Sequence, residues 1–170
     1  MKARRRPART GVGARRPRRR PSMKRDRALI PLSQQHHNGL ALCVLTNRDL
    51  ADDVSEPARR RLARRIVDRW DIELVNHFEL EEQLLFPACP PVLAPLVDEL
   101  VAEHRAIERL TARLRSEASE ELLREFTGLL RRHIRREEDE LFQQAQQMIP
   151  RAMLDKIGGE IDSKAVRVCL

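Results

Sequence analysis

Tyrosine is absent from this 170-residue sequence, and the other aromatic residues are only four phenylalanines and one tryptophan. So few aromatic side chains argue against a protein that stacks the bases of single-stranded nucleic acid. No apolar run is long enough to cross a bilayer, so we expect no membrane partner. Cysteine is scarce too, with only Cys43, Cys89 and Cys169. Their odd number and scattered positions match no zinc-binding spacing, which predicts reduced thiols in a cytoplasmic protein.

Acidic residues are missing from residues 1–22, which hold ten of the 33 lysines and arginines. The whole chain has a net charge of +7, so residues 23–170 carry +7 − 10 = −3. Residues 1–22 lack the apolar side chains that a core requires, and we expect a disordered basic tail. Such a tail could bind nucleic acid weakly, and it lacks the apolar stretch of a targeting peptide. We favour a third interpretation, in which the natural chain starts at Met23.

Strand patterns are missing as well, because no stretch alternates apolar and polar residues for long. Apolar residues recur instead at spacings of three and four, which is typical of helices. Proline and glycine suggest where the helices end, with a final breaker at Gly158 and Gly159. Serines precede three of the helices as expected N-caps: Ser33, Ser55 and Ser119. The predicted helices span about Ser33–Asp53, Ser55–Phe86, Val92–Ser116, Glu120–Met148 and, as a short fifth helix, Arg151–Ile157.

Short connections between long helices favour antiparallel neighbours. We therefore predict an all-α fold, an up-down-up-down antiparallel four-helix bundle with a short fifth C-terminal helix. The chain length suits one domain. The expected organisation is a tail over residues 1–22, the bundle over residues 23–160 and a flexible C-terminus over residues 161–170.

Two segments share one arrangement of histidine and glutamate. In NHFELEEQLLFP, His77 precedes Glu81 by four residues, and in RRHIRREEDELF, His133 precedes Glu137 by four. At about 100° per residue, each pair falls on the apolar stripe of its helix. These four side chains are therefore expected to face the bundle interior. Other acids nearby are expected to face solvent: Glu79, Glu82, Glu138 and Asp139.

The other two long helices each offer histidine as well. His104 shares a face with apolar residues, and Glu108 follows one turn later near the edge of that stripe. His36 and His37 are adjacent, so only one of them can point straight inward. The apolar residues of this helix centre close to His36, which is the one we favour.

A single histidine on an apolar face is usually a hydrogen-bonded core residue. Several of them together with buried glutamates are harder to explain, because unpaired carboxylates in a dry core cost several kcal/mol each. Bound cations remove that cost. Four imidazoles and two carboxylates exceed what one closed zinc site needs. Mixed ligation of this kind suits iron, manganese or zinc, and two irons sharing bridging oxygens fit the ligand count best.

The order H…HxxxE…H…HxxxE resembles the hemerythrin family in its HHE cation-binding form, over about Leu32–Ile157. This resemblance implies a four-helix bundle with an oxo- or hydroxo-bridged non-haem di-iron centre. The imidazole ligands would be His36 or His37, His77, His104 and His133, and the bridging carboxylates would be Glu81 and Glu137. Oxygen-carrying members have a second histidine one turn after the third-helix histidine and an aspartate on the fourth helix. Glu108 stands at that histidine position here, either as a ligand or leaving a position open.

The resemblance therefore implies a protein that binds dioxygen, nitric oxide or peroxide, or that senses or handles iron. A di-iron enzyme of repair or of peroxide or nitric-oxide removal is an alternative, to be distinguished by turnover. A helical scaffold that binds polyanions through its basic tail is a further alternative, but it leaves the inward glutamates unexplained.

Overall fold

The structure, a computed structural model, describes residues 24–167, and all regular secondary structure in that range is helical. This observation confirms the predicted all-α class. The predicted disordered tail lies outside the described residues, as do residues 168–170. Within residues 24–167, no helix combines the length and apolar character needed to span a bilayer.

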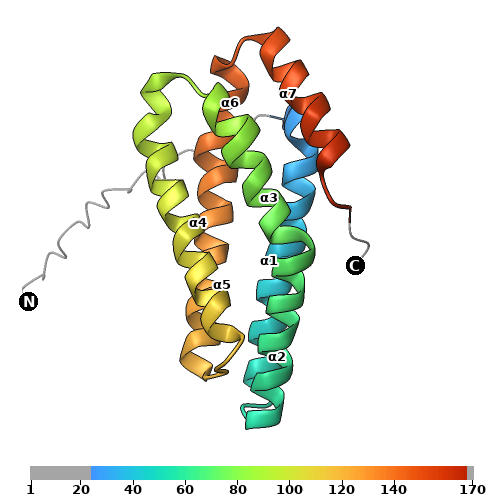
Figure 1. Ribbon diagram of the computed structural model, residues 1–170, viewed down its shortest axis with the longest axis vertical. Helices are drawn as coiled ribbons and strands as arrows, with labels where there is room; N and C mark the ends of the chain where they lie inside the picture. The colour runs from blue at the N-terminus through green and yellow to red at the C-terminus, as the bar shows by residue number, and fades with distance from the viewer. Residues whose placement is uncertain (1–23, 168–170) are drawn as a thin grey trace, which may run out of the picture.

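Four long helical segments lie side by side, and their connections lie at alternate ends of the molecule in Figure 1. A further helix, α7 (Arg151–Lys164), packs against η1 at one end of the bundle. The elements of the four segments, in chain order, are η1 (Arg27–Leu29) and α1 (Ile30–Asp52); α2 (Glu56–Arg69), η2 (Trp70–Leu74), α3 (Val75–Leu80), η3 (Glu81–Leu85) and η4 (Phe86–Ala88); η5 (Pro91–Leu93) and α4 (Ala94–Leu114); and α5 (Glu120–Arg136), η6 (Glu137–Leu141) and α6 (Phe142–Met148).

Side-chain caps fix where the segments begin. The Ser55 and Ser119 side chains accept hydrogen bonds from the amides of Ala58 and Leu122, which confirms both predicted N-caps. The predicted N-cap at Ser33 is wrong, because the first segment begins earlier and Asp26 caps η1. Proline at the start of α1 is tolerated there, since the first amides of a helix have no intrahelical acceptor.

The predicted helix break at Gly158 and Gly159 is also wrong, because α7 continues through both residues to Lys164. The predicted boundary at residue 160 therefore falls inside a helix. A Cβ on Gly158 would lie 2.5 Å from the Cβ and 2.7 Å from the Cα of Ala28. Gly158 is thus needed for close contact between α7 and η1, whereas a Cβ on Gly159 would meet nothing within 4 Å.

Three turns within the long segments are π-helical: η2, η3 and η6. η3 begins at Glu81 and η6 begins at Glu137, so both glutamates of the repeated HxxxE pattern open a π-turn. Single π-turns inside α-helices occur frequently at functional sites. The apolar periodicity of the sequence did not predict these turns.

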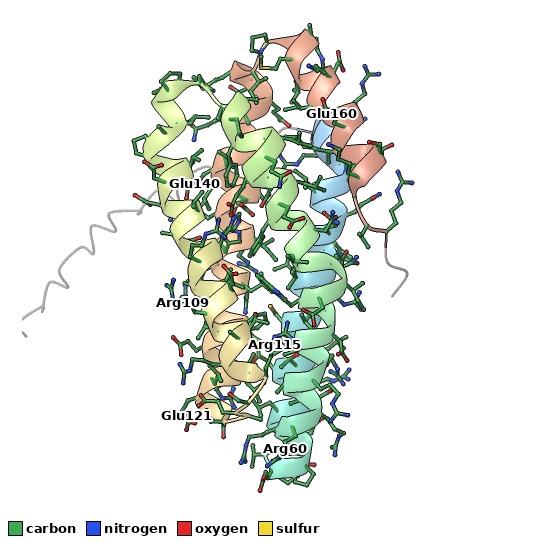
Figure 2. All side chains as sticks on the ribbon, viewed as in Figure 1. Arg60, Arg109, Arg115, Glu121, Glu140 and Glu160 are labelled. Atoms are coloured by element: carbon green, nitrogen blue, oxygen red, sulfur yellow. The ribbon has the colours of Figure 1, made fainter. Side chains whose placement is uncertain are left out.

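The apolar core is divided into two clusters with a polar layer between them. On the fourth segment, Leu130 and Ile134 belong to one cluster, while Leu141 and Phe142 belong to the other. Glu137 lies between these two pairs, His133 lies one turn before it, and both are fully buried. Charged residues cover the outer faces, and Figure 2 labels several of them there: Arg60, Arg109, Arg115, Glu121 and Glu140.

Candidate metal centre

Each of the four long segments contributes one histidine to the polar layer, and two contribute a glutamate. These six side chains are at most 2% exposed. Their potential ligand atoms form two groups, and within each group the atoms lie within 4.8 Å of one another. The two groups share both carboxylates: His36, His77, Glu81 and Glu137 form one, and Glu81, His104, His133 and Glu137 form the other.

The Nε2 atoms of the histidines converge on the two carboxylates. Nε2 of His36 lies 3.0 Å from Oε2 of Glu137 and 3.8 Å from Oε1 of Glu81. Nε2 of His77 lies 3.4 Å from Oε1 of Glu81. On the other side, Nε2 of His104 lies 3.4 Å from Oε2 of Glu81. Each glutamate therefore faces imidazoles of both groups.

Six polar atoms of this cluster are buried and form no well-aligned hydrogen bond, although Nε2 of His36 lies 3.0 Å from Oε2 of Glu137. They are Nε2 of His36, Nε2 of His77 and all four carboxylate oxygens of Glu81 and Glu137. A buried polar atom without a partner costs about 1–3 kcal/mol, and more if it is charged. Nitrogen and carboxylate oxygen are both ligands for first-row transition metals. The donor set therefore fits a pair of cations, which would satisfy all six atoms.

The opposite ring nitrogen of every histidine has a partner. Nδ1 lies 2.8 Å from a glutamate oxygen in three cases, with Glu138 next to His36, Glu82 next to His104 and Glu103 next to His133. Nδ1 of His77 lies 3.0 Å from Oε1 of Gln35. A neutral imidazole that gives its Nδ1 proton to such an acceptor has its Nε2 lone pair available for a ligand. Partners of this kind orient metal-binding histidines in many proteins.

Glu82 and Glu138 were predicted to face solvent, and this prediction is wrong. Both are only half-buried, but each carboxylate turns inward to a histidine of a neighbouring segment. Glu103 was not singled out at all. Helical spacing could not have identified these residues, because each partner lies on a different helix. The predictions for Glu79 and Asp139 are confirmed, since both are exposed.

Glu82, Glu103 and Glu138 each form an ion pair with an arginine. Arg25 pairs with Glu138, Arg105 pairs with Glu82, and Arg136 pairs with Glu103. The last pair joins Nη1 of Arg136 and Oε1 of Glu103 at 2.9 Å. Each of these carboxylates therefore contacts an arginine with one side and an imidazole with the other.

Aromatic rings pack against the histidines. The ring of His104 stacks on Phe78 at 3.7 Å between centroids and on Phe86 at 5.6 Å. His36 stacks on Phe142 at 5.2 Å. These contacts exclude water from one side of each ring and help to fix its orientation.

The two carboxyl groups of the cluster differ in the direction in which their pKa values are shifted. Burial and the neighbouring Glu137 raise the pKa of Glu81 well above its usual value. Burial alone would raise the pKa of Glu137 too, but the nearby His133, His104 and His36 lower it well below its usual value. The two carboxyl groups, which share the same neighbours, therefore have pKa values shifted in opposite directions.

Two sequence candidates lie outside the cluster. His37 is exposed, so the structure brings His36 rather than His37 to the polar layer. Glu108 is exposed and pairs with Arg105 at 3.5 Å. The six remaining candidates come together as the sequence analysis expected: His36, His77, Glu81, His104, His133 and Glu137.

The family model of the Hemerythrin HHE cation binding domain matches residues 31–145, which is more than half of the chain and includes all six residues of the cluster. No curated protein and no solved structure matches the chain.

Proposed function

Because this chain belongs to the hemerythrin HHE cation-binding domain family, we propose that its buried histidines and glutamates bind a pair of metal cations. His36 and His77 would bind one cation through Nε2, and His104 and His133 would bind the other. Glu81 and Glu137 would bridge the two, since each carboxylate faces imidazoles of both groups.

The observation that carries this proposal is the set of six buried polar atoms without partners. An ordinary polar core would pair such atoms with one another or with hydroxyl and amide groups. In this cluster the Nδ1 atom of every ring has a partner, the Nε2 atoms of His36 and His77 have none, and those of His104 and His133 have only each other, at 3.1 Å. A two-cation centre accounts for both facts.

Iron is the metal that we propose, with manganese or zinc as alternatives. Imidazole and carboxylate together suit all three metals. Structural zinc is usually complete with four ligands around one ion, and these six residues exceed that need. A bound iron pair would supply the capacity to bind small ligands such as dioxygen or nitric oxide and to exchange electrons.

The protein's own residues would shape that chemistry by burial. Phe78, Phe86 and Phe142 cover the imidazoles, and Leu74 and Leu130 are buried in the adjoining core. This apolar surrounding would limit the access of water and favour small, weakly polar ligands.

We infer sensing or iron handling rather than reversible oxygen carriage. Glu108 stands where oxygen-carrying relatives have a further histidine, and it points to solvent. The cluster thus offers two imidazoles to each cation. We also propose that the four long segments run up-down-up-down, which the alternating connections in Figure 1 support. We further propose a cytoplasmic location, with which the unpaired Cys43 and Cys89 agree.

Metal analysis of anaerobically reconstituted protein tests the proposal. We expect about two irons per chain and a new visible absorption band on exposure to air. His36→Ala and Glu137→Ala should lose iron, while His37→Ala and Glu108→Ala should keep it, because the last two residues are exposed. Protein that takes up no metal after reconstitution would overturn the proposal. Catalytic turnover of peroxide or nitric oxide would favour the enzyme alternative over stoichiometric binding.

A further inference from the structure

The two halves of the proposed centre differ in the groups that hold their histidines. In the His104–His133 half, both Nδ1 atoms face carboxylates, those of Glu82 and Glu103. In the other half, only His36 faces a carboxylate, and His77 faces the neutral side-chain amide of Gln35. The asymmetry therefore comes from one residue.

The orientation of the Gln35 amide is fixed by its other contacts. Its Nε2 donates to Oδ1 of Asn76 at 3.2 Å and to the carbonyl oxygen of Val166 at 3.1 Å. Asn76 is held as well, since its Oδ1 accepts from the amide of Val166 and its Nδ2 donates to the carbonyl of Lys164. With Nε2 committed to two acceptors, Oε1 of Gln35 must face His77. The neutral amide is thus built into the site.

An imidazole that donates its proton to a carboxylate is a more basic ligand than one that donates to a neutral amide. We propose that Gln35 makes the His36–His77 half bind its cation more weakly than the His104–His133 half, so that the two cations bind in separate steps. This inference rests on the two-cation site proposed above.

The position of Gln35 favours exchange of the cation in the His36–His77 half with solvent. Gln35 lines a surface cavity of about 590 Å³ together with His37, Asn38 and Val166. The same side chain contacts His77 on its inner side. The weaker half is therefore separated from the cavity by one side chain, and we expect its cation to be the last to bind and the first to be lost.

Calorimetric titration of the metal-free, full-length protein with Fe²⁺ under anaerobic conditions tests this inference. The unaltered protein should show two steps that differ by about tenfold or more in affinity. Glu103→Gln should weaken binding in the tighter step by about 10- to 100-fold, which would reduce, close or reverse the difference in affinity between the two steps. Gln35→Met should weaken the looser step and increase that difference. Glu79→Gln, an exposed change on the same segment as His77, should alter neither step.

General destabilisation of the fold would not change the difference in affinity between the two steps in opposite directions. The two variants therefore distinguish an effect on how the histidines are positioned from an effect on folding. Proton NMR gives a second measurement, because shifted imidazole N–H signals of His104 and His133 should appear with the first equivalent of Fe²⁺. Two equal affinities, or variants that weaken the same step, would overturn this inference and leave the two-cation site standing. A protein that binds no Fe²⁺ would overturn both.

Discussion

Adding a methyl group at each of two adjacent glycines should have opposite effects on stability. Gly158 and Gly159 both lie inside α7, so Gly→Ala at either position gains about 0.5–1 kcal/mol of helix stability. At Gly158 the new Cβ would lie 2.5 Å from the Cβ and 2.7 Å from the Cα of Ala28. The second atom belongs to the backbone of η1, which cannot rotate away.

The cost of close packing at Gly158 follows from the difference in stability between the two variants. Because the helix-propensity gain is common to both, the difference between them is the cost of forcing α7 away from η1. Overpacking of this kind costs about 1–3 kcal/mol. Gly159→Ala should therefore be more stable than the unaltered protein, and Gly158→Ala should be less stable than Gly159→Ala by that amount.

Thermal unfolding of the metal-free proteins measures the difference. For a chain of this size, 1 kcal/mol corresponds to about 2–4 °C, so the two melting temperatures should differ by about 2–12 °C. Urea titration gives the same comparison independently of temperature. Equal melting temperatures for the two variants would show that Gly158 is not required for close packing of α7 against η1.

Three further predictions concern the polar layer. Fe²⁺ at 100 times its dissociation constant should stabilise the protein against anaerobic thermal unfolding by about 2.7 kcal/mol per site, and Glu137→Ala should abolish that gain. Glu81→Leu should stabilise the metal-free protein by about 1–3 kcal/mol in urea unfolding, because it removes an unpartnered buried carboxyl group, and a loss of stability would contradict this. Iron affinity should rise between pH 7 and pH 9 in chelator competition. Burial lowers the pKa of His133, but Glu137 and Glu103 raise it to about 9, so below that pH a proton must leave before the cation binds. A pH-independent affinity would show that no proton is displaced.

Local signals in the sequence were sufficient for the helices and for the six inward residues. The spacing of four between His77 and Glu81, and between His133 and Glu137, places each pair on one helical face whatever the rest of the fold does. The choice of His36 over His37 followed from the same geometry, because adjacent residues differ by about 100° around a helix. Short-range caps such as Ser55 and Ser119 were predictable for a similar reason, since a cap bonds to an amide within its own first turn.

Features that depend on a neighbouring helix were not predictable in this way. Glu82, Glu103 and Glu138 looked like solvent-facing acids or drew no notice, because each meets its histidine on a different segment. Gly158 looked like a helix breaker until η1 was placed against it.

The sequence by itself determined that this chain forms helices with a buried stripe of histidine and glutamate, because helical periodicity is a local property. Only the tertiary structure decided that the Nε2 atoms converge on two shared carboxylates and that one of the four Nδ1 atoms faces Gln35. Those distances join segments far apart in the chain, and they depend on how the helices pack rather than on the spacing within any one of them.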